Sequence, residues 1–228
     1  MGLTHFSERL SYLAHDPICD RPMLAYLKGN THTLAIDAGY SAAHVADFYT
    51  ALSNAHLKKP DFTVITHWHY DHTFGLFATE GTSIAHENTA VFLKEQQTHA
   101  VNPEYITELK QADPRFAIEY EKCDTPTIAL PTLTYSDRLT LNLGDLTAYL
   151  FHATAPHSED TTCIYVPEEK VLFLGDATSE DFFNDGYMDT DKLKALIRTI
   201  EATPCTHCIL SHCEPLSKED LLAYLYTL

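Results

Sequence analysis

Short apolar runs bounded by polar and turn residues recur along the chain, and they predict a protein rich in β-strands. The run at residues 62–66 reads as a buried strand that ends in a burst of polar residues. The predicted strands are residues 23–27, 32–37, 62–66 and 83–85 in the first half of the chain, and 139–143, 146–152, 162–166, 171–174 and 208–210 in the second half.

Apolar residues at helical spacing predict helices between these strands. The clearest is residues 191–202, where four apolar side chains share one face. Residues 41–56 show the same spacing, with Ser41 as the N-cap. Further helices are predicted over residues 86–96 and 104–111, and from Ser217 onward, where Ser217 and Asp220 have the spacing of a capping box.

The order of these elements predicts an α+β fold in which two β-rich halves pack face to face with helices outside, a four-layer αββα sandwich. We expect one domain over residues 1–228. Residues 97–125 are polar and without strand character, and they interrupt this pattern as an insertion. Its aromatic side chains make it a candidate lid over a binding site, and a plain surface excursion is the alternative.

Charge and composition narrow the possible partners. The formal charge is −17, from 15 Lys and Arg against 32 Asp and Glu, so a nucleic-acid partner is not expected. No apolar run approaches the roughly 18 residues that a membrane span needs, and the first twenty residues contain no secretory apolar region. With 6 Cys in 228 residues, the chain is typical of a reduced cytoplasmic protein and not of a disulfide scaffold.

The strongest chemical signal follows the run at 62–66, where the sequence reads H-x-H-x-D-H from His67 to His72. His67 and His69 are two residues apart, so on an extended backbone both side chains point the same way and can share one metal ion. Asp71 and His72 follow as the chain turns and can reach a second ion. The alternative is a solvent-exposed loop that happens to be rich in His.

Other predicted strands also end in potential ligands, which weakens that alternative. His157 follows the run at 146–152, Asp176 follows 171–174, His212 follows 208–210, and Asp37 ends 32–37. Polar side chains placed directly after apolar strands are how a rigid scaffold presents a site at one rim of its sheets.

This ordered set resembles the metallo-β-lactamase superfamily from Asp37 to His212. The resemblance implies the αββα sandwich with a dinuclear metal site at one rim. It also implies a role for each residue. The first metal would be held by His67, His69 and His157, the second by Asp71, His72 and His212, with Asp176 bridging both ions and Asp37 supporting the site from behind.

Residue identities within the family favour some branches over others. Asp176 stands where true β-lactamases usually have Cys or Ser, and His69 stands where flavin-linked di-iron relatives generally have Glu. The ligand set is most similar to that of glyoxalase II, lactonases and other dinuclear hydrolases. Two positions depart from the pattern: Ser179 replaces a Tyr typical of lactonases, and Pro156 replaces the Gly that often precedes the third-motif His.

We therefore expect a metal-dependent hydrolase that acts on a thioester, lactone or ester of a small metabolite. Nitrogen and carboxylate ligands without thiolate suit two Zn²⁺ ions and tolerate Fe or Mn. The ions would make a bridging hydroxide the nucleophile, with Asp71 as the catalytic residue that orients it and shuttles a proton. The alternatives are a phosphodiesterase on the same metal pair, an iron-dependent enzyme similar to persulfide dioxygenases, and a binding protein with an inactive site.

The remaining Cys and His residues lack a matching pattern. Cys205 and Cys208 with Cys213 have spacing that metal sites also use, but Cys208 begins a predicted core strand, so buried structural thiols are expected. The other candidates are expected to be ordinary core or surface histidines: His86, His99 and His152.

Overall fold

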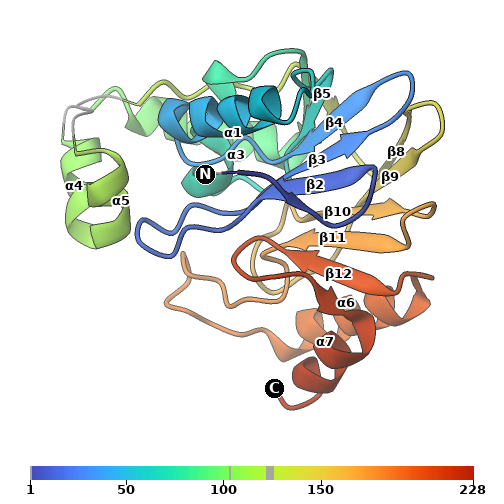
Figure 1. Cartoon of the computed structure of the whole chain (residues 1–228). Coiled ribbons are helices and arrows are strands. Elements are labelled where there is room, and N and C mark those ends of the chain that lie inside the picture. Colours follow the sequence, from blue (N-terminus) through green and yellow to red (C-terminus); the bar gives the residue numbers. More distant parts are fainter. Residues whose placement is uncertain (1, 103, 122–125) are drawn as a thin grey trace.

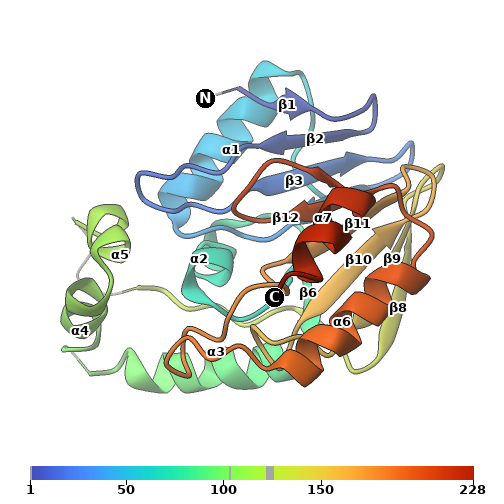
Figure 2. The ribbon, with the colours of Figure 1, turned by 90° about the horizontal axis from the view of Figure 1, so that it is seen from below.

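The computed structural model describes residues 2–102, 104–121 and 126–228. Two β-sheets lie face to face, with helices on both outer sides (Figures 1 and 2). The α+β fold class and the αββα layering predicted from the sequence are therefore confirmed. None of the helices in the described part of the chain is both long and apolar enough to cross a membrane.

The first sheet has strands β1 to β7 in chain order within the described residues. β1 to β4 pair antiparallel, whereas β4, β5, β6 and β7 run parallel, so that these four strands end at the same edge. The strands are β1 (Thr4–His5), β2 (Leu10–Leu13), β3 (Leu24–Lys28), β4 (Thr33–Ile36), β5 (Phe62–Val64), β6 (Thr82–His86) and β7 (Leu133–Tyr135).

The second sheet has the order β13-β12-β11-β10-β9-β8. Its neighbouring strands are antiparallel except β11 and β12, which run parallel and so end together. The strands are β8 (Arg138–Asn142), β9 (Thr147–His152), β10 (Thr162–Val166), β11 (Val171–Gly175), β12 (His207–Leu210) and β13 (Leu216–Ser217).

Apolar side chains from both sheets meet in a core between them, which includes Leu27 from the first sheet and Phe173 from the second. Helix α1 (Ala42–Asn54) covers the outside of the first sheet through Phe48 and Leu52. Helices α6 (Thr190–Ala202) and α7 (Lys218–Leu225) cover the outside of the second (Figure 2). The remaining helices are α2 (Tyr70–Thr73), η1 (Leu76–Ala78), α3 (Glu87–His99), α4 (Tyr105–Ala112) and α5 (Pro114–Glu119).

The predicted strands and helices are present with shifted ends, and several further elements were not predicted. The strand predicted over 62–66 ends at Val64, and residues 65 and 66 lead straight into the His-rich motif. Ser41 is the N-cap of α1, as predicted, and its side chain accepts a hydrogen bond from the His44 N–H. The elements not predicted are β1, β2, β7, β13, α2, η1 and α5.

The part of the insertion around α5 is tied firmly to the body of the protein. Arg21 donates two hydrogen bonds to the buried Glu119 carboxylate, at 2.8 and 3.0 Å. Phe116 is fully buried and stacks on Tyr120, with ring centroids 4.5 Å apart. Residues 113–120 are therefore fixed to the body of the protein. The lid proposed for the whole of 97–125 stays a prediction. Residues 103 and 122–125 of this segment lie outside the described residues.

Candidate metal centre

The seven predicted ligands come together at one rim of the sandwich because their strands end there. His67 to His72 follow β5, Asp176 follows β11, and His212 follows β12. His157 lies in the loop between β9 and β10. Two of the chain segments that carry the ligands meet at Gly175 and Thr66. A Cβ on Gly175 would lie 2.8 Å from the Thr66 side chain, so only glycine leaves room there. The φ of +57° at Gly175 is also one that glycine adopts without strain.

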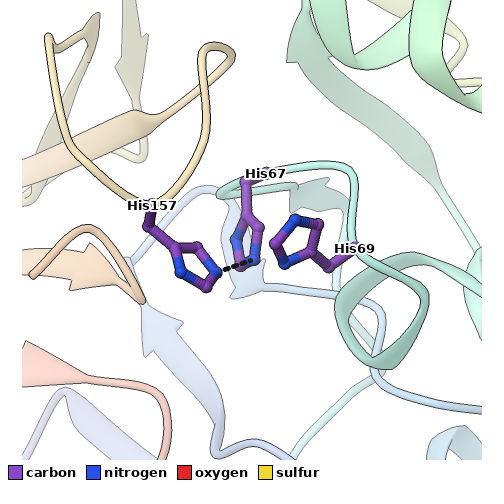
Figure 3. Close-up of side chains that lie close together, drawn as sticks. All are labelled: His67, His69 and His157. Atoms are coloured by element: carbon purple, nitrogen blue, oxygen red, sulfur yellow. Dashed lines mark hydrogen bonds between the residues drawn. The ribbon is translucent and has the colours of Figure 1, made fainter. Parts of the chain in front are cut away.

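His67, His69 and His157 form a first group, in which one nitrogen from each ring lies within 4.8 Å of the others (Figure 3). The Nε2 atoms of His67 and His157 are 3.2 Å apart. All three side chains are nearly inaccessible to solvent, with exposed fractions of 5% or less. Three imidazoles that point their nitrogens into one buried volume are a donor set that suits Zn²⁺ and other borderline divalent ions.

Asp71, His72, Asp176 and His212 form a second group with the same mutual spacing. Asp176 Oδ2 lies 3.3 Å from His72 Nε2 and 3.2 Å from His212 Nε2. It also lies 3.8 Å from His157 Nε2 in the first group. Asp176 therefore lies between the two groups, at the position expected of a bridging ligand.

Asp37 supports both groups from behind. His72 Nδ1 donates to Asp37 Oδ2 at 2.8 Å. The Thr66 hydroxyl donates to the same carboxylate at 2.9 Å and lies 3.0 Å from His67 Nδ1, from which it accepts. Asp37 is buried, and its φ of +65° is unusual for a residue other than glycine. Its position agrees with the supporting role that the resemblance implied.

The hydrogen bonds on the far side of the rings leave metal-facing nitrogens free, so the donor set fits divalent ions. His157 Nδ1 donates to the Glu180 carbonyl at 2.7 Å, which leaves Nε2 as a lone-pair donor. His72 is held in the same way by Asp37. The buried His72 Nε2 has no hydrogen-bond partner in the described part of the chain, although two carboxylates lie near it. A polar atom without a partner at this depth is costly unless it binds an ion.

The two groups differ in the protonation that their surroundings favour. Burial and the neighbouring imidazoles lower the pKa of His67 and His69 well below the usual value. Burial also disfavours a charged His212, yet the Asp176, Asp20 and Asp71 carboxylates raise its pKa to about 12. In the second group, opposite charges therefore hold each other in place.

Two residues that the sequence analysis missed support the ligands. Asp20 Oδ1 lies 3.2 Å from His212 Nδ1, and the other oxygen pairs with Arg115 from α5. Asp160 is fully buried and accepts hydrogen bonds from the Ser158 hydroxyl at 2.5 Å and the Thr89 hydroxyl at 2.6 Å. Asp160 stood three residues after His157 in the sequence, whereas nothing local linked Asp20 to a ligand.

A cavity of about 520 Å³ opens over the two groups. Tyr70 and Tyr40 stand on one side, where both hydroxyls donate to the Asp113 carboxylate, at 2.7 and 3.3 Å. The cavity is lined by Asp20, Tyr40, His69, Tyr70, Asp71, Ala112, Asp113, Arg115, His157, Asp176, Ser179, Phe182, Phe183 and His212. Such a concave site next to a cluster of metal-binding side chains is where a small molecule would bind.

The other Cys and His candidates do not join a possible metal site within the described residues. Cys205 and Cys208 are buried in the core beneath α6 and α7, as predicted, whereas Cys213 is only half-buried. His86 and His152 stack on each other with ring centroids 4.4 Å apart. They bond to backbone carbonyls, so they are structural histidines. His99 contacts the ring of Tyr105.

Comparison with known proteins places this site in a family. A family model described as the metallo-beta-lactamase superfamily matches residues 24–187. The acyl-coenzyme A thioesterase MBLAC2 of Bos taurus is 23% identical over 167 residues, which cover 69% of this chain and 58% of that protein. The 2,4-dinitroanisole O-demethylase subunit alpha of Nocardioides sp. (strain JS1661) is 26% identical over 155 residues, covering 66% of this chain and 39% of that one. The matched regions thus span well under two thirds of either relative.

A solved structure supports the same assignment at the level of the fold. A metallo-beta-lactamase from Pontibacter korlensis superposes with a TM-score of 0.70 over 99% of both chains, at 17% sequence identity. The family model covers more than half of the chain, and the ligand cluster occupies the rim at which the resemblance placed it. The chain therefore belongs to the metallo-β-lactamase superfamily.

Proposed function

We propose that this protein is a metal-dependent hydrolase that cleaves an acyl bond (a thioester, lactone or ester) in a small molecule. The observation that carries the proposal is the convergence of five imidazoles and two carboxylates in two touching groups beneath a cavity. The distant relative named as an acyl-coenzyme A thioesterase supports the choice of an acyl bond.

The first group would hold one divalent ion and the second group another, with Asp176 shared between them. Zn²⁺ suits these ligands, and Fe or Mn would be tolerated. When bound, such ions supply Lewis acidity toward a carbonyl oxygen and lower the pKa of water to near neutrality.

Asp71 has the position and charge for proton transfer. Its Oδ2 atom lies 3.2 Å from His212 Nε2, and its side chain lines the cavity. Burial would favour the protonated acid, but the nearby His72 and His212 hold the pKa of Asp71 well below its usual value. The carboxylate is therefore ionised. Oδ2 faces His72 and His212 and would bind the second ion, whereas the other oxygen would orient a water molecule and pass its proton to the leaving group.

The charges around the cavity have to be considered together with those of the proposed ions. Four carboxylates line the cavity, whereas Arg115 is the lone cationic Lys or Arg side chain among the described residues of the lining, and it is already paired with Asp20. Two bound divalent ions would offset these four charges. The choice between a neutral acyl substrate and an anionic phosphodiester therefore rests on the named relative and on the assay below.

The test begins with metal analysis of natively purified protein, followed by assays on thioesters, lactones and bis-p-nitrophenyl phosphate. We expect close to two divalent ions per chain and turnover of an acyl substrate that Asp71→Asn abolishes. Asp137→Asn is the matched control, because the Asp137 side chain is 87% exposed. One iron per chain with sulfur-oxidising activity, or turnover of the phosphodiester alone, would overturn the proposal.

A further inference from the structure

We propose that Phe182 and Phe183 form a binding wall for the hydrocarbon part of the substrate, so that the preferred substrates carry an extended apolar acyl group. The inference rests on the proposed hydrolysis of an acyl bond and adds the substrate class to it. Its basis is an unusual placement, because two neighbouring aromatic side chains, 65% and 54% exposed, line the cavity beside the first metal-binding group.

Both rings lie directly against the ligands. The Phe183 ring centroid is 4.6 Å from that of His69 and 4.7 Å from that of Trp68. The Phe182 ring meets His157 edge-on, with centroids 5.7 Å apart. A hydrocarbon chain whose carbonyl group sits at the metal centre would therefore contact these rings within its first few carbons.

The loop that carries the two residues, 181–187, is closed by hydrogen bonds between its two ends. Asp181 N–H donates to the Tyr187 carbonyl at 3.1 Å, and Gly186 N–H donates to the Asp181 carbonyl at 3.0 Å. Asp185 and Gly186 both have positive φ, which produces a tight turn. The Phe183 N–H donates to the Asp181 side chain at 3.1 Å. These bonds fix the backbone that carries the two rings, so less entropy is lost when a ligand binds there.

The cavity is polar on its other side, which fixes how a substrate would lie. Asp20, Asp113 and Arg115 line it there, beside the second metal-binding group and the N-terminal end of α5. Apolar surface on one side and charged side chains on the other give an acyl substrate one favourable orientation, with its hydrocarbon over the Phe residues and its leaving group toward the charges.

The single tryptophan of the chain provides a readout that does not depend on catalysis. Because Trp68 contacts Phe183, a ligand on the wall should change its fluorescence. We would titrate the Zn²⁺-loaded protein with acetate, butanoate, hexanoate and octanoate, and check the affinities by calorimetry. Kd should fall by about twofold to fourfold per methylene, the upper value corresponding to about 0.8 kcal/mol for a methylene fully removed from water.

Substitutions locate the effect. Phe183→Ala and Phe182→Ala should flatten the dependence of Kd on chain length, and Phe183→Leu should restore most of it because it keeps apolar surface. Tyr187→Ala is the matched control, because Tyr187 is 59% exposed in the same loop but does not line the cavity. The same dependence should appear in kcat/KM for acyl thioesters of N-acetylcysteamine.

The outcomes separate this inference from the proposed function. Chain-length-dependent binding without hydrolysis would refute the function and leave the wall intact. Hydrolysis with equal Kd values from acetate to octanoate, or equal losses in Phe183→Ala and Tyr187→Ala, would refute the wall. A dimer in sedimentation that Phe183→Ala converts to monomers would also refute it, because the rings would then form a subunit interface.

Discussion

The two ligand groups lie side by side, yet they are built in opposite ways. The first consists of three imidazoles, each at most 5% exposed, and burial lowers the pKa of His67 and His69 well below the usual value. The second pairs two carboxylates with two imidazoles, and three of its side chains are 11% to 27% exposed to the cavity. There, the pKa of His72 is raised well above its usual value although burial opposes this, because three carboxylates surround it.

One rim of the sandwich therefore combines a group built from imidazoles alone with a group built from ion pairs. The first group consists of imidazoles alone, whereas the second pairs imidazoles with carboxylates that offset part of their charge before any ion binds. Asp176 contacts residues of both groups. Metal-free stability should therefore depend more on the second group.

The substitution Asp176→Ala should have the largest effect on both groups. Without this carboxylate the imidazolium groups of the second group lose a buried counter-charge, which costs about 3 to 5 kcal/mol of unfolding free energy in the metal-free protein. Both metal equivalents should bind more than about 100-fold more weakly, beyond the loss typical of outer partners. Urea unfolding with a chelator and metal-competition titrations measure these quantities. If the variant binds two ions as tightly as the parent, Asp176 is not shared.

Replacing one ligand in each group should separate them. His67→Ala should weaken the first metal equivalent by more than about 100-fold and the second by far less, and His212→Ala should do the reverse. Metal content after dialysis and competition against a chromogenic chelator distinguish the two equivalents. Equal losses of both ions in the two variants would show that the groups act as one site.

Substitution of Asp20 tests whether a residue that is not itself a predicted ligand strengthens metal binding by the second group alone. The Asp20 carboxylate lies 3.2 Å from His212 Nδ1 as a counter-charge, so Asp20→Ala should weaken binding of the ion in the second group about 10- to 100-fold and leave that in the first unchanged. Asp20→Asn should recover only part of the affinity, because it keeps an oxygen near Nδ1 but removes the charge.

Asp16→Ala is the control for this experiment, because Asp16 stabilises the same loop by accepting from Ile18 N–H at 2.9 Å. If the parent binds three ions and Asp20→Ala loses only one, Asp20 belongs to a separate cation site with His15 and His212 instead.

The sequence predicted the layers of the fold because most core strands are short apolar runs. It missed β2 (Leu10–Leu13) because polar residues surround it and one lies inside it, where the buried Ser11 is satisfied by a hydrogen bond with His5 Nδ1 at 2.8 Å. Helix α5 was also missed, although Asp113 and Pro114 are an N-cap and first-turn pair that could have revealed it.

The ligand groups could be predicted residue by residue because each ligand follows an apolar strand. Their supports could not, because they depend on contacts between distant segments. Asp20 lies next to His212 although 192 positions separate them in the sequence. Similarly, only the contacts of Phe182 with His157 and of Phe183 with His69 show that these two rings lie beside the ligands. The metal-binding roles of the seven ligands stay predictions until ions are measured.

The smallest expected effect concerns Asp160, which lies behind the first group and is surrounded by uncharged donors. Burial raises its pKa to about 6, and the hydrogen bonds from Ser158 and Thr89 offset this only in part. The folded protein holds this proton more tightly than the unfolded chain, in which the pKa of the carboxyl is 3.8. The stabilisation that the protonated Asp160 gives the folded state is therefore complete below pH 3.8 and is lost as the pH rises through 6.

Asp160→Asn mimics the protonated acid and removes this dependence. Relative to this variant, the metal-free parent should therefore gain roughly 1 kcal/mol of unfolding free energy between pH 7 and pH 5. Urea unfolding of both proteins with a chelator measures the difference, in which the titration of all other groups cancels. A difference that does not change with pH would mean that Asp160 is ionised across this range, and that the first group has a charged support like that of the second.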